Sequence, residues 1–456
     1  MSNHKKVLII GAGLAGSDAA MYLAENGFLV VLVDSKTINK NEAQKLDTFA
    51  ELVCTNSLKS KNIYSAHGLL KYEMECLNSL IIQIAKETSV PAGDALAVDR
   101  VLFSEKITQK LKEHPNITVK DEDISDPVEA TARFNCDYTI IATGPLTTQK
   151  LSDWMMTNLS ESDLYFYDAI APVVEADSLD LSEMYYKDRY KAIDDKKDAD
   201  YLNIPMDKDQ YLSFIKKLLD AERVPPKNFE KIKYFESCLP IETMAERGIE
   251  TPRFSCMKPV GLELEDGTLP YAVIQLRREN LLGDSYNLVG FQTRLTYPEQ
   301  LKVFRSIPGL ENAKFNHLGS IHRNTFLDAR KLLNIDLSSK GNPNLFFAGQ
   351  ITGVEGYTES AAMGLYVAFQ IVNREATGSG KVFPKESAMG ALVNYLMTVP
   401  KPTPSNINFG LLPSVTLSKE QRKNRKLRKK IKKELAVVKA QEIFQNQILK
   451  EIKCSE

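Results

Sequence analysis

The chain has 456 residues, of which 43% are hydrophobic and 26% are charged, and its formal net charge is −1. This length predicts two or three domains, and the composition is that of an ordinary soluble globular protein. The six cysteines show no C-x-x-C spacing, so we expect no metal site. No apolar run reaches the roughly 18 residues that a membrane span needs. With no secretory signal, we expect reduced thiols and a cytoplasmic location.

The first predicted elements are a strand, a glycine-rich turn and a helix. Residues 7–10 are apolar, as in a buried parallel strand, and lead directly into the G-x-G-x-x-G sequence Gly11, Ala12, Gly13, Leu14, Ala15 and Gly16. These glycines permit a tight turn, close approach of the backbone to a pyrophosphate, and close packing of the next helix. A second apolar strand, residues 28–33, ends in Asp34, where a carboxylate can bond an adenosine ribose hydroxyl. Together these features predict dinucleotide binding.

Cys54 lies between a short apolar run and a turn-forming Thr-Asn-Ser sequence. Free cysteine commonly behaves as a small buried hydrophobic residue, so a purely structural role is one interpretation. The loop position and the nearby Lys59 and Lys61 favour the other interpretation, a reactive thiolate. The residues alone leave both interpretations open.

Further helices and a strand are predicted before the composition of the chain changes at about residue 165. Residues 69–87 predict one long helix, and residues 103–111 predict another. Residues 138–144 predict a strand that ends at Gly144 and closes a nucleotide-binding sheet, as in many two-dinucleotide flavoproteins. From about residue 165 the sequence becomes rich in Asp, Glu, Lys and Tyr without a phosphate loop. We interpret this change as an inserted domain, within which Cys238 precedes Leu-Pro-Ile-Glu.

The chain then returns to alternating elements. Thr296-Tyr-Pro-Glu299 predicts a capping box for a helix at residues 300–306. A strand ending at Gly349, a loop containing Gly353 and a small-residue helix at residues 361–372 predict a second anion-receptive segment. FAD-binding folds use such a late segment, whereas a protein that binds only NAD through the first loop does not need it. The predicted cofactor is therefore FAD.

The C-terminal segment is strongly basic. A Pro-containing linker at residues 401–404 is followed by Ser418-Lys-Glu-Gln421, which predicts the cap of a helix. Residues 419–433 contain a single acidic residue, Glu420, and ten basic residues: Lys419, Arg422, Lys423, Arg425, Lys426, Arg428, Lys429, Lys430, Lys432 and Lys433. Such a concentration of charge fits either a solvated terminal helix or a contact with RNA.

The predicted fold class is α/β, with a Rossmann-like FAD-binding domain of the glutathione-reductase type and an inserted α+β domain. Residues 1–165 and 315–400 are predicted to form the two parts of the FAD-binding domain. Residues 166–314 would form the inserted substrate or RNA domain, and residues 401–456 the linker and basic helix.

Nine motifs, in order over nearly the whole chain, resemble the folate- and FAD-dependent tRNA (uracil-5-)-methyltransferase family, a relative of the flavoprotein that modifies wobble uridines. The first is the glycine-rich loop. The others are Glu51-Leu-Val-Cys54-Thr-Asn-Ser-Leu58, Val90-Pro-Ala-Gly93 with Ala95-Leu-Ala-Val-Asp99-Arg100, Cys238-Leu-Pro-Ile-Glu242, Met257-Lys-Pro-Val-Gly-Leu262, Tyr286-Asn-Leu-Val-Gly-Phe-Gln-Thr293, His322-Arg-Asn-Thr325, Gly353-Val-Glu-Gly-Tyr357 and Asn408-Phe-Gly-Leu-Leu-Pro413.

The resemblance implies methylation of uridine C5 in structured RNA, with the T-loop uridine of tRNA as the expected target. It implies methylenetetrahydrofolate as the carbon donor, tightly bound FAD as carrier and reductant, and NAD(P)H as the electron source. It also implies two functional cysteines, which match Cys54 and Cys238. Uracil C5 becomes nucleophilic after a thiolate adds at C6, a role that we assign to Cys238, with Cys54 handling the C5 proton.

The chain departs from the family pattern at three places. Ser237 stands where glycine is usual, Ser255-Cys256 where Gly-Pro is usual, and Ile204 where cysteine is usual. All three lie in the predicted insertion, so they bear on the RNA target more than on the chemistry. A 23S rRNA uridine is therefore the alternative target. Two further hypotheses are wobble-uridine modification with a GTPase partner and RNA binding by a flavoprotein without catalysis.

Overall fold

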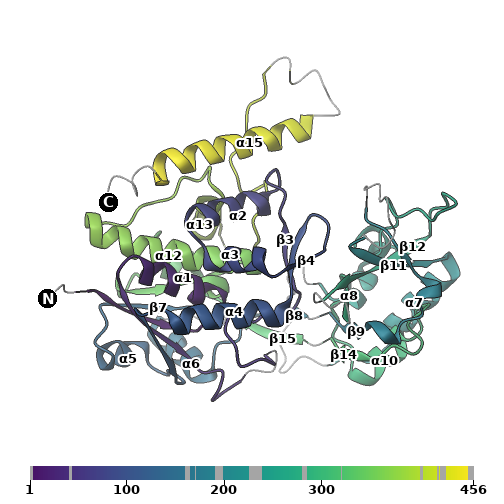
Figure 1. Cartoon of the computed structure of the whole chain (residues 1–456), viewed down its shortest axis with the longest axis horizontal. Helices are drawn as coiled ribbons and strands as arrows, with labels where there is room; N and C mark the ends of the chain where they lie inside the picture. The colour runs from purple at the N-terminus through teal and green to yellow at the C-terminus, as the bar shows by residue number, and fades with distance from the viewer. Residues whose placement is uncertain are drawn as a thin grey trace.

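The computed structural model describes residues 4–40, 44–159, 165–169, 171–189, 199–224, 239–279, 285–319, 321–400, 404–418, 421 and 428–449. Figure 1 shows two bodies, a larger one formed by the early and late parts of the chain and a smaller one formed by its middle. Cys238 lies outside the described residues. Among the helices that are described, none combines the length and apolarity needed to cross a lipid bilayer.

The larger body is built on a parallel five-stranded sheet in the order β16-β7-β1-β2-β6. Its strands are mostly apolar and buried, as expected where helices cover both faces of a sheet, except for the edge strand β6, which is polar and largely exposed. The strand β16 returns from late in the chain to pair with β7, so two distant segments share one sheet. The strands are β1 (Lys6–Ile10), β2 (Leu29–Asp34), β6 (Ile117–Asp121), β7 (Tyr138–Ile141) and β16 (Leu345–Phe347).

Helices α1 (Leu14–Glu25) and α12 (Tyr357–Thr377) pack against each other and are buried over most of their length. The remaining helices of this body are α2 (Ala66–Cys76), α3 (Leu80–Glu87), α4 (Arg100–Glu113), α5 (Pro127–Arg133), α6 (Gln149–Leu159), α11 (Ala329–Leu332), α13 (Ala388–Thr398) and α15 (Arg428–Phe444). Two short helical turns, η5 (Gly349–Thr352) and η6 (Gln445–Leu449), follow β16 and α15. A small antiparallel sheet adds β3 (Ser57–Ser60), β4 (Ser89–Val90) and β5 (Ala95–Val98) in the order β3-β5-β4.

The prediction of one long helix at residues 69–87 is wrong, because the segment forms the two helices α2 and α3. Asn78 between them adopts the left-handed conformation, with φ of 57°, which stops α2. Ser79 then caps α3, and its hydroxyl oxygen accepts a hydrogen bond from the amide of Ile82 at 3.2 Å. Apolar spacing continues across this break, so periodicity alone hides it.

The smaller body has an antiparallel six-stranded sheet in the order β10-β11-β12-β13-β9-β14. Helices pack on it around an aromatic core that includes Tyr211, Phe214, Phe291 and Phe304. The strands are β9 (Val173–Glu175), β10 (Tyr185–Tyr186), β11 (Tyr201–Met206), β12 (Ala272–Arg278), β13 (Ser285–Leu288) and β14 (Phe315–His317). The helices are α7 (Lys208–Asp220), α8 (Ile241–Arg247), α9 (Thr251–Phe254) and α10 (Tyr297–Phe304), with the short turns η1 (Ala176–Ser178) and η2 (Leu181–Glu183).

A two-stranded antiparallel ribbon of β8 (Tyr165–Ala169) and β15 (Ile321–Thr325) joins the two bodies. The predicted boundary after residue 314 lies directly before β14, which pairs with β9 of the smaller body. The domain division of residues 166–314 stays a prediction, and this pairing suggests that the insertion extends to residue 317. The sheet of the larger body and the helices around it confirm the predicted Rossmann-like α/β fold.

Two predicted helix caps have different outcomes. Thr296 precedes α10, but its side chain makes no capping hydrogen bond, so the predicted capping box is wrong. Glu299 pairs instead with Lys302 at 3.2 Å. By contrast, Ser418 Oγ accepts a hydrogen bond from the amide of Gln421 at 3.2 Å, and Gln421 Oε1 accepts one from the amide of Ser418 at 2.9 Å. These reciprocal bonds are those predicted for Ser418 and Gln421.

Candidate cofactor and thiol site

The first glycine-rich loop joins β1 to α1 and needs its glycines for different reasons. Gly11 has a φ of 105°, and a side chain there would place a Cβ atom 2.6 Å from the carbonyl oxygen of Ala142 at the end of β7. A Cβ at Gly16 would lie 1.8 Å from the carbonyl oxygen of Gly11. Both positions therefore exclude any side chain, because the loop, β7 and α1 pack backbone to backbone.

Gly13 differs from its neighbours because a Cβ atom there would meet no other atom within 4 Å. Gly13 is also the N-cap of α1, and it forms no side-chain cap for the amides of the first helical turn. Unpaired amides at a helix N-terminus attract anions, and the open space at Gly13 lets such a group approach the backbone. The residues of this loop fit the pyrophosphate of a dinucleotide.

Asp34 ends β2 beside this loop. Its Oδ2 accepts a hydrogen bond from the amide of Ala12 at 2.6 Å, and its Oδ1 accepts one from the amide of Lys36 at 2.8 Å. These two bonds fix the carboxylate at the loop, where the sequence predicts contact with a ribose. A carboxylate has further lone pairs, so both bonds leave capacity for a ribose hydroxyl.

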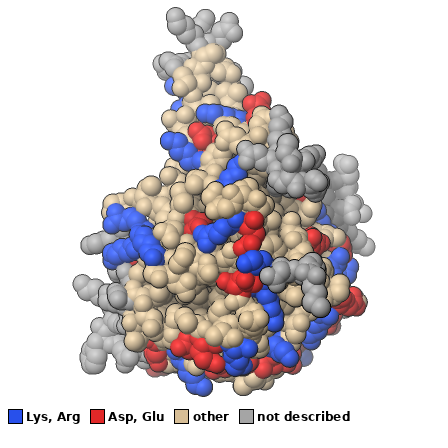
Figure 2. All heavy atoms as spheres, turned by 90° about the vertical axis from the view of Figure 1, so that its left-hand side faces the viewer, with Lys and Arg blue, Asp and Glu red and all other residues tan. Residues whose placement is uncertain are grey.

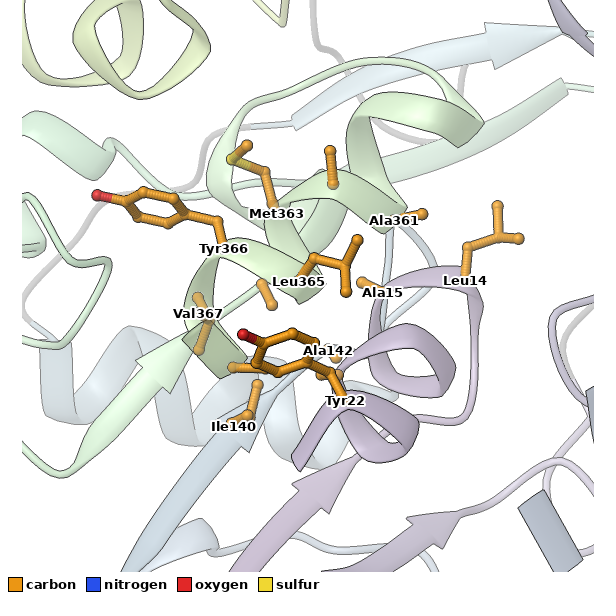
Figure 3. Close-up of a cluster of buried hydrophobic side chains, with 14 of the residues drawn as sticks. Leu14, Ala15, Tyr22, Ile140, Ala142, Ala361, Met363, Leu365, Tyr366 and Val367 are labelled. Atoms are coloured by element: carbon orange, nitrogen blue, oxygen red, sulfur yellow. The ribbon is translucent and has the colours of Figure 1, made fainter. Parts of the chain in front are cut away.

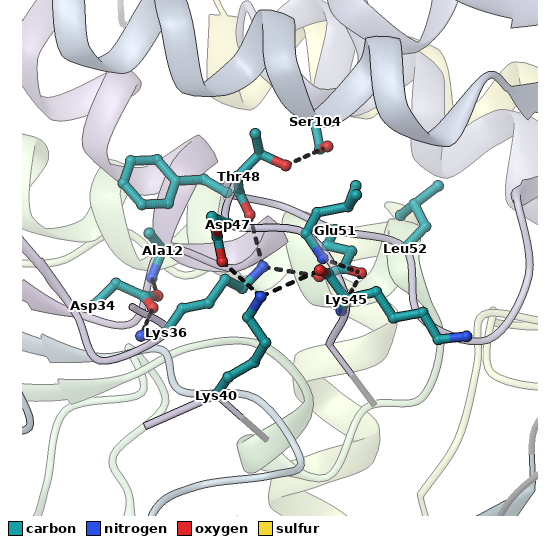
Figure 4. A network of polar contacts seen from close by, with 12 residues as sticks. Ala12, Asp34, Lys36, Lys40, Lys45, Asp47, Thr48, Glu51, Leu52 and Ser104 are labelled. Atoms are coloured by element: carbon teal, nitrogen blue, oxygen red, sulfur yellow. Dashed lines mark hydrogen bonds and ion pairs between the residues drawn. The ribbon is translucent and has the colours of Figure 1, made fainter. Parts of the chain in front are cut away.

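A buried ion pair holds the segment between Asp34 and Cys54 (Figure 4). Lys36 Nζ lies 3.0 Å from Glu51 Oε2, and only 5% and 7% of the two side chains are exposed. The same ammonium donates to the carbonyl of Thr48 at 2.6 Å, and Glu51 Oε1 accepts from the amide of Lys45 at 2.8 Å. Each member of the pair thus has a further hydrogen-bond partner besides the other, as expected for a buried charge. Glu51 thereby anchors the chain three residues before Cys54.

The late glycine segment lies directly against the first loop. A Cβ at Gly349 would lie 2.8 Å from Cβ of Ala15, and a Cβ at Gly364 of α12 would lie 2.1 Å from the carbonyl oxygen of Ala15. Figure 3 shows the apolar contact that follows, with Leu14 and Ala15 of α1 beside Ala361 and Leu365 of α12. The structure therefore brings together two loops that are predicted, far apart in sequence, to bind one cofactor.

Gly144 and Gly353 occupy different surroundings. Gly144 follows β7, has a φ of 68°, and would accept a Cβ without a contact within 4 Å. Gly353 has a φ of 96°, and a Cβ there would meet Leu396 of α13 at 3.3 Å and Phe326 at 3.7 Å. Packing against α13 accounts for glycine at position 353, and a cofactor contact by either residue stays a prediction.

Cys54 is half-buried, and its backbone is held by the residue that begins α12. The hydroxyl of Tyr357 accepts hydrogen bonds from the amides of Cys54 at 2.6 Å and of Thr55 at 3.1 Å. Burial raises the pKa of Tyr357, so this hydroxyl remains protonated at neutral pH. Because Gly356 precedes Tyr357, the thiol loop and the late cofactor loop share one anchoring point.

Two arginines hold the segment on either side of Cys54. Arg100 donates to the carbonyl of Leu52 at 2.9 Å, while Arg277 donates to Thr55 Oγ1 at 2.5 Å and to Asn56 Oδ1 at 3.0 Å. Arg100 belongs to α4 and Arg277 to β12 of the smaller body. Sequence reasoning assigned neither arginine to the site. Arg277 is more than two hundred positions from its partners and Arg100 is 48 positions from Leu52, so no local pattern connects them.

A buried polar cluster surrounds the start of α12. Glu359 is fully buried, with its Oε1 3.3 Å from His67 Nδ1 and 3.8 Å from Lys59 Nζ. Burial alone would raise the pKa of Glu359, but Lys59 and His67 outweigh it and hold the pKa at about 2. A Cβ at Gly356 would lie 2.3 Å from Glu359 Oε2, so this cluster also explains the glycine. The carboxylate is therefore charged at neutral pH.

The predicted second thiol, Cys238, lies outside the described residues, but the chain after it is well anchored. Ile241 donates its amide to the carbonyl of Gln292 at 2.8 Å. Glu242 is fully buried, and it accepts hydrogen bonds from Thr293 Oγ1 at 2.9 Å and from the amide of Arg294 at 2.8 Å. The Leu-Pro-Ile-Glu motif is thus tied to the Phe-Gln-Thr motif of the same resemblance.

The other described cysteines are poor candidates for a thiolate. Burial raises the pKa of Cys76, raises that of Cys136 to about 11, and raises that of Cys256 to about 12. A thiol with such a pKa is protonated at neutral pH and a weak nucleophile. Across the part of the chain that the structure describes, no group of three His, Cys, Asp or Glu side chains could hold a metal ion.

The basic C-terminal helix has two different halves. Val437, Ala440 and Phe444 of α15 are fully buried, and Phe444 meets the ring of Phe383 edge-on at 5.7 Å. The N-terminal end is exposed and basic, at Arg428, Lys430, Lys432 and Lys433. In Figure 1 this helix crosses the top of the larger body above α13 and α2. On the face that Figure 2 shows, basic and acidic side chains are interspersed.

A parallel sheet, two glycine-rich loops in contact and a ribose-positioned acid define an FAD-binding flavoprotein of the Rossmann-like class. The model of the family described as "Glucose inhibited division protein A" matches residues 6–378. The solved structure of Aquifex aeolicus GidA in its form II crystal has a TM-score of 0.66 at 17% identity, covering 99% of this chain and 76% of that chain. At this identity the likeness concerns the fold alone.

Relatives with a higher sequence identity are named methylenetetrahydrofolate–tRNA-(uracil-5-)-methyltransferase TrmFO. The protein of Desulfotalea psychrophila is 48% identical over 419 residues, covering 91% of this chain and 92% of the relative. That of Enterococcus faecalis is 48% identical over 415 residues, covering 90% and 93%. The chain therefore belongs to the folate- and FAD-dependent tRNA (uracil-5-)-methyltransferase family. The predicted family and the predicted FAD cofactor are confirmed.

Proposed function

We propose that this chain is an FAD-dependent enzyme that transfers a one-carbon unit from methylenetetrahydrofolate to C5 of a uridine in tRNA, with the T-loop uridine as target. The observation that carries this proposal is the position of the Cys54 loop. Its backbone is hydrogen-bonded to Tyr357, which directly follows the late cofactor loop. The relatives of the same length, 45% to 48% identical and named for this reaction, support it. The activity would lie in the cytoplasm, where tRNA is modified.

The chemistry needs two thiols because uracil C5 is a weak nucleophile. We assign Cys238 to attack at C6, which places negative charge on the ring and makes C5 reactive. We assign Cys54 to accept the C5 proton after the new bond has formed. When bound, FAD supplies the redox chemistry, taking electrons from NAD(P)H and delivering them to the one-carbon unit.

The residues of the chain then hold the cofactor and the thiol in place. The open backbone at Gly13 and the first turn of α1 would bind the pyrophosphate, and Asp34 the adenosine ribose. Tyr357, Arg100 and Arg277 would keep Cys54 at a fixed position beside the two loops. Such preorganisation lowers the barrier because little reorientation is left for the reaction step.

RNA is the proposed macromolecular partner. The exposed basic end of α15 offers charges for the phosphate backbone, which dominates the affinity of proteins for nucleic acids. Its buried half fixes the helix on the larger body, so these charges have a defined position. The smaller body, which carries the segment after Cys238, would contact the target uridine.

The test is a reconstitution with FAD, NADPH, methylenetetrahydrofolate and tRNA from a strain that lacks 5-methyluridine. We expect 5-methyluridine in the T-loop by mass spectrometry, and no product with Cys238→Ala or Cys54→Ala that retain FAD. Large-subunit rRNA serves as the competing substrate. Product on rRNA and none on tRNA would replace the proposed target with a 23S rRNA uridine, whereas product on neither would reject the methyltransferase assignment.

A further inference from the structure

The carboxyl end of β12 reaches from the smaller body to the Cys54 loop. Arg277, of which only 6% is exposed, donates from Nη2 to Thr55 Oγ1 at 2.5 Å and from Nε to Asn56 Oδ1 at 3.0 Å. Both acceptors directly follow Cys54 in sequence. A planar guanidinium with two directed bonds defines the orientation of its partners more tightly than a point charge does.

Asn56 is fully buried and also donates hydrogen bonds back to the smaller body. Its side-chain amide nitrogen, with two hydrogens, lies within hydrogen-bond distance of three carbonyl oxygens: those of Arg278 at 3.0 Å and Glu279 at 3.1 Å, and that of Val98 in the larger body at 3.1 Å. Hydrogen bonds therefore run in both directions across the contact, so that neither side can turn without breaking several of them.

A second link lies on the other side of the thiol. Glu279, one residue beyond β12, forms a buried ion pair with Arg100 of α4, and the exposed fractions of the two side chains are 12% and 15%. Arg100 also donates to the carbonyl of Leu52 at 2.9 Å. The two links enclose Cys54 between Leu52 and Thr55, and both depend on the end of β12.

Breaking these hydrogen bonds and this ion pair would cost free energy. Separation of the two bodies would break these bonds and transfer the guanidinium, the carboxylate and the amide from protein partners to water. The bonds of Arg277 to Thr55 and Asn56 therefore exist only while the smaller body is docked on the loop, whereas the bonds of Tyr357 to the loop lie within the larger body.

We propose that Arg277 is a positioning residue that makes the placement of the Cys54 thiol depend on the docking of the smaller body. The smaller body holds the segment that follows Cys238, so one side chain couples the RNA-facing part of the chain to the thiol beside the cofactor loops. The consequence for turnover rests on the proposed function, whereas the coupling itself does not.

The first experiment measures the thiol directly in the FAD-bound protein. Wild type, Arg277→Gln and Thr55→Val are treated with iodoacetamide, and peptide mass spectrometry follows each cysteine separately. We expect Cys54 to be alkylated at least about fivefold faster in both variants, because the freed loop exposes the thiol, while the buried Cys256 stays at the wild-type rate. Thr55→Val removes a single hydroxyl, so it tests the link even if Arg277→Gln folds poorly.

Arg305→Gln is the matched control. Arg305 donates from Nε and Nη2 to the carbonyl of Ala313 at 3.1 and 2.9 Å, so it is an anchored arginine of the smaller body without a bond to the thiol loop. We expect wild-type alkylation of Cys54 in this control. Arg277→Lys keeps the positive charge but lacks the planar guanidinium that forms two directed hydrogen bonds. We therefore expect its alkylation rate at Cys54 to resemble that of Arg277→Gln.

The second experiment measures steady-state methylation of tRNA by the same proteins. We expect kcat to fall at least about tenfold in Arg277→Gln with KM for tRNA within about twofold of wild type, since the lost interaction acts on the reacting group. The double variant Thr55→Val, Arg277→Gln should be no slower than Arg277→Gln alone, because both remove the same link.

Wild-type alkylation of Cys54 in Arg277→Gln and Thr55→Val, with FAD bound, would overturn the proposal. Faster alkylation of Cys256 together with Cys54 would also overturn it, since that pattern reports general loosening. If wild type methylates no RNA but Cys54 alone responds to the variants, the proposed function fails and the coupling stands.

Discussion

The phenolic oxygen of Tyr357 binds the amides of Cys54 and Thr55, at 2.6 and 3.1 Å, across 303 and 302 positions of sequence. Tyr357 is the first residue of α12, and α12 packs on α1, which begins at the first glycine-rich loop. The thiol loop and both cofactor loops are thus fixed to one helix pair. A shift of α12 would move all three together.

The variant Tyr357→Phe should impair the reaction more than it impairs the fold. It leaves two part-buried amides without an acceptor, which costs about 1–3 kcal/mol in the free energy of unfolding. We expect kcat for tRNA methylation to fall at least about tenfold, because the Cys54 loop loses its anchor. Urea unfolding and steady-state kinetics on the FAD-bound protein measure the two effects.

Tyr366→Phe is the matched control, on the same helix. Tyr366 is buried, and its hydroxyl donates to the carbonyl of Ile335 at 2.9 Å, away from the Cys54 loop. A stability loss of about 1 kcal/mol with wild-type kcat is expected there. Equal kinetic losses in both variants would mean that the tyrosine hydroxyl at Cys54 has no particular role.

The variants Gly13→Ala and Gly16→Ala should distinguish an effect on FAD binding from an effect on the stability of the fold. Gly13 has φ of −73° and ψ of −168°, which alanine adopts readily, and its Cβ would meet nothing in the apoprotein. We therefore expect Gly13→Ala to keep the melting temperature of the apoprotein but weaken FAD binding at least about tenfold, or about 1.4 kcal/mol. Gly16→Ala should lower both, since its Cβ would lie 1.8 Å from a backbone oxygen.

Thermal unfolding of the apoprotein and FAD titration followed by flavin fluorescence provide the two readouts. Tight FAD binding by Gly13→Ala would show that the pyrophosphate does not approach this part of the loop. An undiminished melting temperature in Gly16→Ala would contradict the close contact between α1 and the loop.

Stability should depend on pH through Asp18, a buried acid on α1. Burial raises its pKa to about 7, although Asp18 Oδ2 accepts from Ser79 Oγ at 2.6 Å. Between about pH 4 and about pH 7 the folded state therefore keeps a proton that the unfolded state releases. The free energy of unfolding must then fall as the pH rises through this window, and the contribution is fully present only below it.

The variant Asp18→Asn removes this dependence, because an amide does not titrate there, and it retains an oxygen for the amide of Ile81. Urea unfolding of both proteins measures this at several pH values. As the pH rises from about 4 to about 7, the free energy of unfolding of the variant should increase by about 1–4 kcal/mol relative to that of wild type. Parallel curves for the two proteins would show that Asp18 keeps an ordinary pKa when folded.

The exposed charges of α15 should contribute to RNA affinity without contributing to the fold. In Lys430→Gln, Lys432→Gln two exposed ammonium groups are lost, while the buried side of the helix is untouched. We expect tRNA affinity to fall about tenfold and the slope of log Kd against log salt to decrease by about two. Filter binding at several salt concentrations measures both quantities.

The control for this variant removes two exposed lysines elsewhere, Lys110 on α4 and Lys120 on β6. An equal loss of affinity in Lys110→Gln, Lys120→Gln would show that net charge alone matters. An unchanged salt slope in the α15 variant would mean that this helix is simply solvated.

Local patterns predicted the cofactor part of the fold well. The strand, the G-x-G-x-x-G loop, Asp34 and the late glycine segment each follow from a short sequence whose physical demand is local. The errors are also local: the left-handed Asn78 interrupts a helix whose apolar spacing continues, and Thr296 has the right neighbours for a capping bond that it does not form.

The surroundings of Cys54 could not be predicted in the same way. Its anchors Tyr357, Arg100 and Arg277 come from three separate elements, and only tertiary packing brings them to the loop. Tyr357 belongs to a motif of the family resemblance, which marked its importance but not its partner. For Arg277 the sequence offers no signal beyond a basic residue at the end of a strand.

The backbone contact of Gly349 and Gly364 with Ala15 has a consequence for ligand choice. Because helices α1 and α12 touch without intervening side chains, the two glycine loops cannot move apart or together to suit a different ligand. A ligand therefore meets the two loops as one fixed surface, and a cofactor that contacts both loops gains binding energy from both without a rearrangement of the protein. The helix pair thus favours a cofactor that contacts both loops over one that contacts a single loop.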